Sequence, residues 1–299
     1  MKRECSIVRD VLPLYFENMV SEDTAVFVKE HLENCSDCAA ELECLKSGKK
    51  IDKAEVAGVG IGVPGPVEET GEIPCAVNLH WGRKNIEKEL GDLTGLAVKA
   101  GNDANVAALG EMWKGGGQSA KNLILVTLGT GVGGGIIVNE KIVTGAHGAG
   151  GEIGHAFVNP AETKACNCGN KGCLEQYASA TGIARLAKEA LESETEDSVL
   201  RTVKNISAKS VFDAYKEGDV LAGKIVDKFA AYLGNALAVF ACVSDPDVFV
   251  IGGGVSKAGQ VLIDAVEKYY KAHAFTASKE TPIKLATLGN DAGIYGAAS

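Results

Sequence analysis

The sequence is short of proline, of positive charge and of long apolar runs. It holds 7 prolines against 37 glycines, which indicates many tight backbone turns and not a disordered linker. Its formal net charge is −9 and no basic stripe stands out, so we expect no direct binding to nucleic acid or to an anionic membrane surface. No uninterrupted apolar run reaches about 18 residues, which argues against a membrane span.

The N-terminal residues also lack the apolar core and the small-residue cleavage site of a secretory leader. Hydrophobic residues make up 46% of the 299 residues and charged residues 23%, which is typical of a globular protein with one large domain or two lobes. The 9 cysteines are an odd number, and most of them belong to groups with metal-ligand spacing. We therefore expect a cytoplasmic protein with reduced thiols.

Residues 1–46 differ from everything that follows. Apolar residues recur there at helical spacing and predict three short helices. His31, Cys35 and Cys38 follow an H-x3-C-x2-C pattern, which places the first two of them one helical turn apart. Cys5, on the preceding helix, is available as a fourth ligand. We expect a zinc site here; the alternative is a lone histidine among scattered buried thiols.

A second cysteine group lies within residues 150–177. It has the pattern H-x10-C-x-C-x4-C around a glycine-bearing turn, formed by His155, Cys166, Cys168 and Cys173. Four such ligands can surround one tetrahedral zinc ion. Glu152 and Glu175 flank the group, so a bound metal would hold two carboxylates near each other. Acceptors arranged in this way favour a polar ligand, and sugar hydroxyls are the natural candidate.

From residue 54 onward the pattern is that of an α/β protein. Apolar, β-branched runs predict strands, and glycine-rich turns separate them. A strand, a glycine-rich turn and a second strand predict a hairpin within residues 121–143. The other strands are predicted within 55–67, 96–100 and 245–256, and helices are predicted from near 102 and through much of 178–244.

Asp103 lies where a predicted strand ends and a predicted helix begins. Two interpretations are open. Either Asn102 or Asp103 simply caps the helix. Alternatively, Asp103 is a general base at the carboxyl end of a strand, where open α/β sheets form their ligand crevices.

Two glycine-rich turns follow apolar strands. Gly129, Thr130 and Gly131 belong to a turn with more glycines than a tight hairpin needs, so backbone N–H groups can approach an anion and the threonine adds a hydroxyl donor. The turn lacks the Gly-Lys-Ser/Thr of a Walker A loop. Gly253 and Gly254 form a similar turn, which we expect to face an adenosine group.

With all four positions of the Cys…His-x3-Cys-x2-Cys pattern present, residues 1–46 resemble the zinc-binding anti-sigma factor domain. The resemblance implies a small helical zinc module that holds an RNA polymerase sigma factor. Recognition of DNA by a helix-turn-helix is not expected, because the segment is acidic and of the zinc type.

Residues 55–299 resemble the ROK family (repressors, open reading frames and kinases), and its glucokinases most of all. The resemblance rests on GVGIGVPGPV, NDANVAALGE, LGTGVGGG, GGEIGH, CNCGNKGCLEQYAS, PDVFVIGGGVS and NDAGIYGAA. It implies a two-lobed actin-like ATPase (ribonuclease H-like) fold, with ATP and Mg²⁺ as phosphoryl donor. It also implies phosphorylation of a hexose, expected to be glucose, at the 6-hydroxyl, and a homo-oligomer.

The resemblance assigns roles to the residues that match the family motifs. Asp103 would be the base that takes the proton of the attacking sugar hydroxyl. The other sugar hydroxyls would be bound by Asn102, Glu152, His155 and Glu175. The zinc of the His155 cluster would be structural and would hold the sugar-binding residues in place. The phosphates would meet Gly129, Thr130 and Gly131, and the adenosine would meet Gly253 and Gly254.

The sequence contains no Asp-x-Gly-Gly-Thr motif, which the family carries on a phosphate-binding turn. We therefore expect an incomplete N-terminal lobe with an open sheet edge, and catalysis weakened by missing phosphate contacts. The expected divisions are a zinc module (1–46), a junction (47–54), a remnant of the N-terminal lobe (55–118) and a C-terminal lobe (119–299). Three interpretations stay open: a glucokinase-type enzyme, a sugar-responsive anti-sigma regulator with a crippled sugar-binding domain, and a gene-fusion artefact without a selected function.

Overall fold

The computed structural model describes the 299 residues except 1–2, 17–18, 47–52 and 77–78. The chain divides into two compact units, Met1–Ala57 and Gly58–Ser299. Each unit has buried hydrophobic residues of its own.

The first unit is built from three helices that pack on one another. These are α1 (Arg3–Phe16), α2 (Glu22–Asn34) and α3 (Ser36–Lys46). The hydroxyl of Ser21 caps α2 by accepting a hydrogen bond of 3.3 Å from the N–H of Thr24. The buried core consists of Cys5, Val8, Leu12, Val28, Cys38 and Leu42. The three helices expected from the sequence are confirmed, and two of the expected zinc ligands are core residues.

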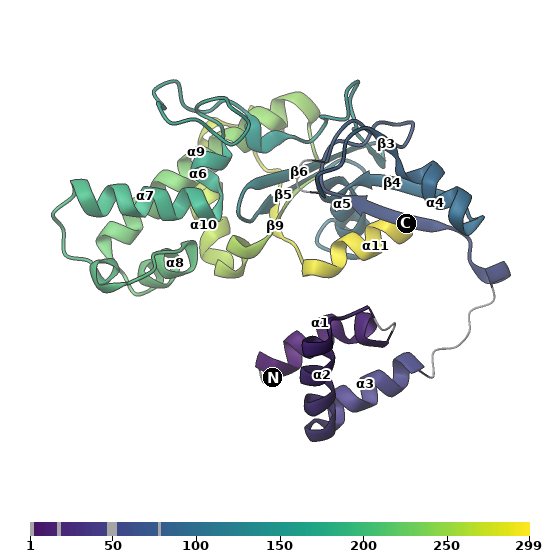
Figure 1. Cartoon of the computed structure of the whole chain (residues 1–299). Coiled ribbons are helices and arrows are strands. Elements are labelled where there is room, and N and C mark those ends of the chain that lie inside the picture. The colour runs from purple at the N-terminus through teal and green to yellow at the C-terminus, as the bar shows by residue number, and fades with distance from the viewer. Residues whose placement is uncertain (1–2, 17–18, 47–52, 77–78) are drawn as a thin grey trace. The chain divides into compact units, whose positions relative to one another are not determined.

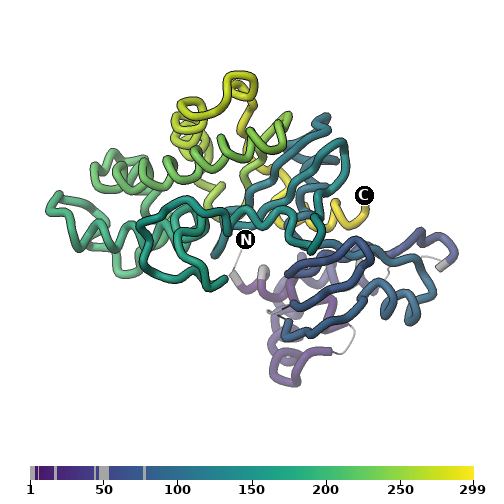
Figure 2. Tube along the Cα trace, turned by 90° about the horizontal axis from the view of Figure 1, so that it is seen from above, coloured from purple at the N-terminus to yellow at the C-terminus, as the bar shows by residue number. Residues whose placement is uncertain are grey.

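The larger unit is organised around a five-stranded sheet of order β7-β6-β5-β8-β9 (Figures 1 and 2). The strands are β5 (Leu123–Leu128), β6 (Val132–Val138), β7 (Lys141–Ile142), β8 (Val248–Gly252) and β9 (Ile283–Leu285). β8 runs parallel to both β5 and β9, whereas β6 is antiparallel to its neighbours. The predicted hairpin is confirmed, since β5 and β6 pair from Leu123 opposite Ile137 to Leu128 opposite Val132.

Helices pack around this sheet, and the longest of them, α9, contacts four others. The helices are α6 (Glu175–Ala178), α7 (Ala180–Ser193), α8 (Ala208–Lys216), α9 (Val220–Ser244) and α10 (Gln260–His273). Among the described residues, α9 is the one helix whose length and composition would suffice to cross a membrane. Of its most apolar stretch, 56% is buried inside the unit, as expected for the core helix of a folded domain.

A smaller parallel sheet lies at the start of the larger unit. β1 (Val59–Val63) pairs with β4 (Val98–Asn102) in register from Val59 opposite Val98. The remaining elements are β2 (Glu72–Ile73), β3 (Lys84–Asn85), α4 (Ile86–Thr94), α5 (Asp103–Lys114) and α11 (Ala292–Ala298). The N–H of Val59 points toward β4 and donates to the carbonyl of Ala97. Because backbone groups alternate along a strand, the N–H and C=O groups of Gly60 and Gly62 point to the edge of β1 that faces away from β4. Within the described part of the chain β1 pairs only with β4, so the expected open edge is present.

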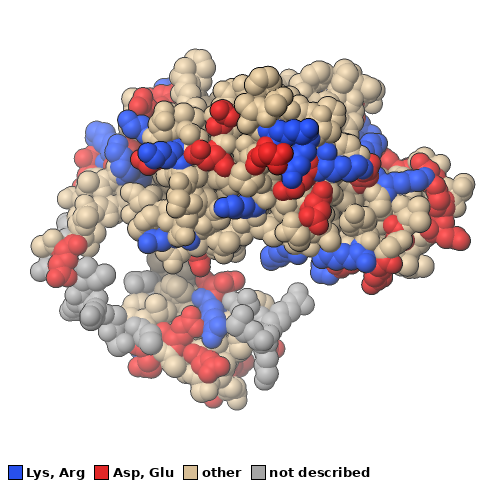
Figure 3. Space-filling view, turned by 180° about the vertical axis from the view of Figure 1, so that it is seen from behind, with Lys and Arg blue, Asp and Glu red and all other residues tan. Residues whose placement is uncertain are grey.

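Charged side chains of both signs lie interspersed on the face of the molecule in Figure 3. Many lysines are paired with carboxylates; three such pairs are Lys88–Asp92 at 2.8 Å, Lys164–Glu189 at 2.9 Å and Lys268–Asp227 at 2.7 Å. The charges on this face are therefore of mixed sign.

Candidate functional site

A cavity of about 270 Å³ opens at the carboxyl ends of β1 and β4. Three expected site residues, Asn102, Asp103 and Glu152, line it together with glycines of β6. Asn102 ends β4 and Asp103 begins α5, whereas Glu152 directly precedes a short 3₁₀ helix, η3 (Ile153–His155). The fold thus brings polar side chains from two distant parts of the sequence to the place where ligands bind in open α/β sheets.

The structure shows which of Asn102 and Asp103 caps the helix. Asn102 is the helix cap: its Oδ1 accepts hydrogen bonds from the N–H groups of Ala104 (3.0 Å) and Asn105 (3.2 Å). Its Nδ2 donates to the carbonyl of Gly65 at 3.0 Å, which holds the loop after β1 against α5. Asp103 is exposed, and its Oδ1 accepts a hydrogen bond of 2.8 Å from the N–H of the next residue. Because the cap is provided by its neighbour, the carboxylate of Asp103 is available to a ligand in the cavity.

The cysteine group beside this cavity forms a compact cluster. The ligand atoms of His155, Cys166, Cys168 and Cys173 all lie within 4.8 Å of one another. The Sγ atoms of Cys168 and Cys173 are 3.6 Å apart, and Sγ of Cys166 lies 3.8 Å from Nδ1 of His155. A tetrahedral zinc ion with Zn–S bonds of about 2.3 Å has S···S edges of roughly 3.8 Å. The donor set therefore fits zinc.

Glu175, the first residue of α6, is one of the two glutamates expected to bind sugar, and it contacts this cluster. Its Oε1 accepts a hydrogen bond of 2.8 Å from Sγ of Cys166 and lies 3.9 Å from Nδ1 of His155. The other ring nitrogen of His155, Nε2, lies 3.9 Å from Oε2 of Glu152. The imidazole therefore stands between two carboxylates, with Nδ1 on the side of the cysteines. Burial, together with the hydrogen bond to Glu175, raises the pKa of the Cys166 thiol.

The glycine turn between β5 and β6 lies against Glu175. A Cβ atom at position 131 would lie 2.7 Å from Oε2 of Glu175, so glycine at this position leaves room for the carboxylate. The carbonyl of Gly129 accepts a hydrogen bond of 2.8 Å from the N–H of Ala180, at the start of α7. Thr130 and Glu175 both line a second cavity, of about 250 Å³. The expected phosphate turn and the expected sugar-binding carboxylate are thus direct neighbours.

A third cavity, of about 340 Å³, lies between α8 and the turn that follows β8. Gly254 of the expected adenosine turn lines it, together with Phe212 and Lys216 of α8. Gly253 has a φ of 81°, and a Cβ atom there would lie 2.6 Å from the backbone of Leu128, so glycine is required at this position. An apolar cavity with a lysine in its lining suits a flat ring system that carries phosphates.

Sequence patterns did not indicate every lining residue. Pro64, Pro66 and Cys75 line the first cavity. The two prolines belong to the motif GVGIGVPGPV, but no sequence pattern placed them, or Cys75, at a site. The sequence indicated only weakly that α8 would line the third cavity. Phe212 and Lys216 are four residues apart, so they share one face of this short amphipathic helix.

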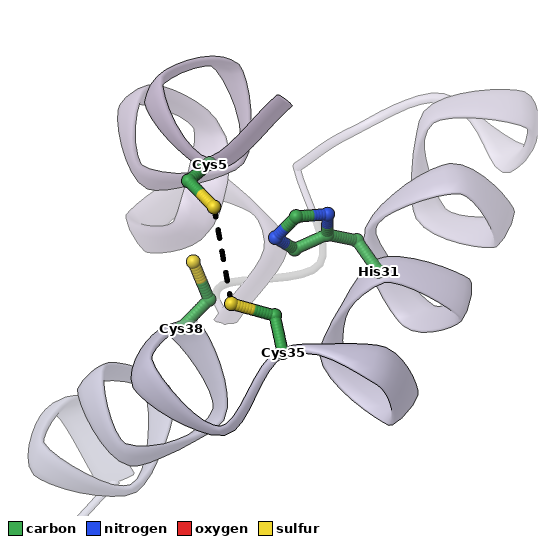
Figure 4. Close-up of side chains that lie close together, drawn as sticks. All are labelled: Cys5, His31, Cys35 and Cys38. Atoms are coloured by element: carbon green, nitrogen blue, oxygen red, sulfur yellow. Dashed lines mark hydrogen bonds between the residues drawn. The ribbon is translucent and has the colours of Figure 1, made fainter. Parts of the chain in front are cut away.

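The first unit holds another cluster, in which Cys5, His31, Cys35 and Cys38 converge (Figure 4). Their ligand atoms lie within 4.8 Å of one another, and the Sγ atoms of Cys5 and Cys35 are 3.8 Å apart. Nε2 of His31 is buried and has no hydrogen-bond partner among the described residues, a deficit that a metal ion would fill. A hydrogen bond from the backbone of Cys38 lowers the pKa of Cys35 to about 7, whereas burial raises the pKa of Cys38 to about 11. This donor set also fits zinc.

Comparison with known proteins decides the family. The ROK family model matches residues 30–299, and a zinc-finger family model matches residues 5–39. The chain belongs to the ROK family. Its N-terminal end carries a zinc-finger segment of the kind found in anti-sigma factor domains, as the sequence indicated. The ROK match begins earlier than residue 55, where the resemblance was expected to start, and it overlaps the zinc-finger match.

The relatives include kinases and regulators. The chain is 45% identical over 266 residues to a glucokinase of Halalkalibacterium halodurans, which covers 87% of this chain and 81% of that protein. A ROK family glucokinase from Streptomyces griseus, solved in complex with glucose and AMPPNP, is 33% identical with a TM-score of 0.70 and coverage of 90% and 86%. A ROK family transcriptional regulator, a homologue of the Escherichia coli MLC protein, is 29% identical with a TM-score of 0.75 and coverage of 87% and 65%.

These neighbours confirm the expected fold class, an α/β actin-like ATPase fold with a small zinc module at its N-terminal end. At the level of the family, the glucokinase relatives and kinase structures support a hexose kinase that uses ATP and a sugar substrate.

Proposed function

We propose that the unit Gly58–Ser299 binds glucose and transfers the γ-phosphoryl group of ATP to its 6-hydroxyl. The observation that carries this proposal is the juxtaposition of Asp103, Asn102 and Glu152 in one cavity. The His155 cluster stands beside it, with its imidazole near Glu152. An exposed carboxylate at a strand end, surrounded by hydrogen-bonding groups, suits a base that acts on a polyol.

In the proposed reaction, Asp103 accepts the proton of the 6-hydroxyl while the hydroxyl oxygen forms a bond to the γ-phosphorus and the bond to the ADP oxygen breaks. The remaining hydroxyls of the sugar are bound by Asn102, Glu152, His155 and Glu175. Phosphoryl transfer depends mainly on positioning and on charge stabilisation, so fixed hydrogen bonds to the sugar contribute directly to the rate.

The nucleotide occupies the other two cavities in this proposal. The phosphates lie at Gly129, Thr130 and Gly131, and the adenosine lies against Gly253 and Gly254 in the 340 Å³ cavity. Mg²⁺ bound to the phosphates would neutralise the charge that develops during transfer. Zinc at His155, Cys166, Cys168 and Cys173 would be structural, because all four donors are protein groups and no position is left for a water.

The absence of an Asp-x-Gly-Gly-Thr motif bears on the rate rather than on sugar binding. The residues that we propose for sugar binding lie at β4, α5, η3 and α6, all of which the structure contains. One missing set of preorganised contacts to the transferred group costs about 10²–10³ in rate. We therefore propose that glucose affinity is retained and that turnover is slow.

A second function is favoured by the first unit. Besides its zinc cluster, this unit exposes large apolar side chains: Ile7, Leu14, Phe16, Met19, Val26 and Phe27. Exposed apolar groups in so small a unit suit a protein partner. In this alternative the chain is a sugar-responsive regulator whose first unit binds a sigma factor. The family resemblance further leads us to propose a homo-oligomer and a cytoplasmic location.

A coupled kinase assay with glucose, mannose and N-acetylglucosamine, combined with calorimetric binding of each sugar, tests both functions. ATP-dependent turnover with glucose supports the kinase. Glucose binding without turnover supports the regulator. Absence of both binding and turnover contradicts the two proposals together.

A further inference from the structure

A buried ion pair lies next to residues 156–174, the segment between η3 and α6 that carries the three cysteines and is here called the zinc-binding loop. Glu162, in the segment between η3 and α6, keeps only 7% of its side chain exposed, and its Oε2 lies 2.9 Å from Nη2 of Arg185 on α7. The same oxygen accepts a hydrogen bond of 2.6 Å from the hydroxyl of Tyr177 on α6. Its other oxygen, Oε1, accepts 3.0 Å hydrogen bonds from the N–H groups of Thr163 and Lys164. One carboxylate therefore joins the loop to two helices.

Arg185 and Tyr177 are held in this arrangement by further contacts. Nη2 of Arg185 also donates to the carbonyl of Gln176 at 3.0 Å, and its guanidinium lies 5.1 Å from the centre of the Tyr177 ring. The Tyr177 ring stacks on Tyr232 of α9 with centroids 4.0 Å apart. Burial opposes the charge on Glu162, but the hydrogen bonds from Tyr177 and Lys164 and the charge of Arg185 outweigh it and lower the pKa of Glu162 to about 2. The pair is thus charged and fixed in position.

Gln176 extends the contacts to both ends of the cysteine segment. Its Nε2 donates to the carbonyl of Lys164 at 3.0 Å, two residues before the first cysteine ligand. Its Oε1 accepts a hydrogen bond of 3.0 Å from the N–H of Cys173, the last ligand. The residue before it, Glu175, is hydrogen-bonded to Cys166. The position of α6 therefore sets both the ligand geometry and the place of the sugar-binding carboxylate.

We propose that Glu162 and Arg185 are positioning residues that clamp the zinc-binding loop onto α6. They hold the Cys166 and Cys173 side chains in the positions that the metal needs, and the Glu175 carboxylate in the position that the sugar needs. The claim about the metal stands by itself, and the claim about the sugar rests on the proposed function. The physical reason is preorganisation: a loop already held in its metal-bound shape loses less entropy when zinc binds, and partners outside the ligand set commonly change metal affinity 10–100-fold.

The test is the rate at which the full-length zinc-loaded protein releases zinc to a chelating dye. Arg185→Gln removes the charge and most of the donors of the clamp. Arg201→Gln is the matched control, because Arg201, in the 3₁₀ helix Val199–Thr202 that follows α7, also donates to backbone carbonyls, those of Leu191, Glu194 and Glu196. Cys38→Ser, which removes a ligand of the first unit, shows which phase of the release belongs to the larger unit.

We expect Arg185→Gln to speed zinc release from the larger unit about 10–100-fold and Arg201→Gln to change it less than about twofold. Equal rates for the wild type and Arg185→Gln would overturn the proposal, and so would equal acceleration by both variants, which would indicate general loosening. If Arg185→Gln does not fold, Tyr177→Phe is the second variant: it removes the hydrogen bond to Glu162 and the one that the hydroxyl accepts from Asn159, and it must show a smaller acceleration in the same phase.

Glucose affinity, measured on the same proteins, separates this proposal from the proposed function. Arg185→Gln is expected to raise the glucose Kd several-fold, because Glu175 is no longer held in position. Faster zinc release in a protein whose wild type binds no glucose would leave the metal clamp standing and contradict the proposed function. Unchanged zinc release in a protein that binds glucose would contradict the clamp alone.

Discussion

Oε1 of Glu175 accepts a hydrogen bond of 2.8 Å from Sγ of Cys166. A residue proposed to bind sugar thereby lies directly against a residue proposed to bind zinc; zinc binding would take the proton of this hydrogen bond, because the ligand is the thiolate of Cys166. We therefore expect the metal cluster and the sugar cavity to be coupled, so that loss of zinc lowers the affinity for glucose.

Removal of zinc is the first test of that coupling. We expect a chelator that strips the His155 cluster to raise the glucose Kd at least 10-fold, because His155 and Glu175 lose the ligand set that fixes them. Isothermal calorimetry before and after chelation measures the change, and restored affinity on addition of zinc is the control. An unchanged glucose Kd in the metal-free protein would contradict the coupling.

A methyl group at position 131 tests the same carboxylate from the opposite side. The Cβ of Gly131→Ala would lie 2.7 Å from Oε2 of Glu175 and must displace it. We expect a glucose Kd about 10-fold higher than that of the wild type. Gly129→Ala is the control, since a Cβ atom there meets no atom within 4 Å. Equal glucose affinities for the two variants would remove Glu175 from the sugar site.

The charge of Glu162 predicts a pH dependence of stability. Its pKa is lowered from 4.5 to about 2 in the folded protein, so its contribution is complete above about pH 4.5 and disappears as the pH falls towards 2. Glu162→Gln should cost roughly 1.5–3 kcal/mol of unfolding free energy at pH 7, as expected for lost hydrogen bonds to a charged group. Urea unfolding of both zinc-free proteins at several pH values measures the gap, and a gap that stays constant down to pH 2 would refute this assignment.

The two metal clusters are predicted to act independently. The wild type should bind two zinc ions per chain, and His31→Gln should bind one, because each cluster has its own four donors in a separate unit. The glucose Kd of His31→Gln should equal that of the wild type. Metal analysis of the purified protein gives the count, and a wild-type count below one would contradict both sites.

The sequence predicted those parts of the site whose residues lie close together in the chain. The spacing of His155 and the three cysteines, and the glycine turn at 129–131, depend on local geometry, so both could be recognised. The cap at Asn102 could not be told from a cap at Asp103, because the distinction depends on where each side chain points. The structure shows that Oδ1 of Asn102 accepts the N–H groups of Ala104 and Asn105, while its Nδ2 donates to Gly65, which lies far away in the sequence.

The clamp at Glu162 and Arg185 could not be predicted, for a different reason. Its members come from a loop, α6 and α7, and no repeating spacing relates them. Each is an ordinary surface-type residue by composition, and only the tertiary fold buries the carboxylate. The position of Cys75 at the first cavity could not be predicted for the same reason: it depends on the tertiary fold.

The most direct test of the account is a comparison of wild type and Asp103→Asn in glucose binding and in single-turnover phosphoryl transfer from ATP. Asparagine keeps the size of the side chain and cannot accept the proton. The account predicts a glucose Kd within a few-fold of the wild type and a transfer rate lower by at least 10²-fold, the usual contribution of a general base. Transfer at the wild-type rate by Asp103→Asn, or a wild type that does not bind glucose, would contradict it.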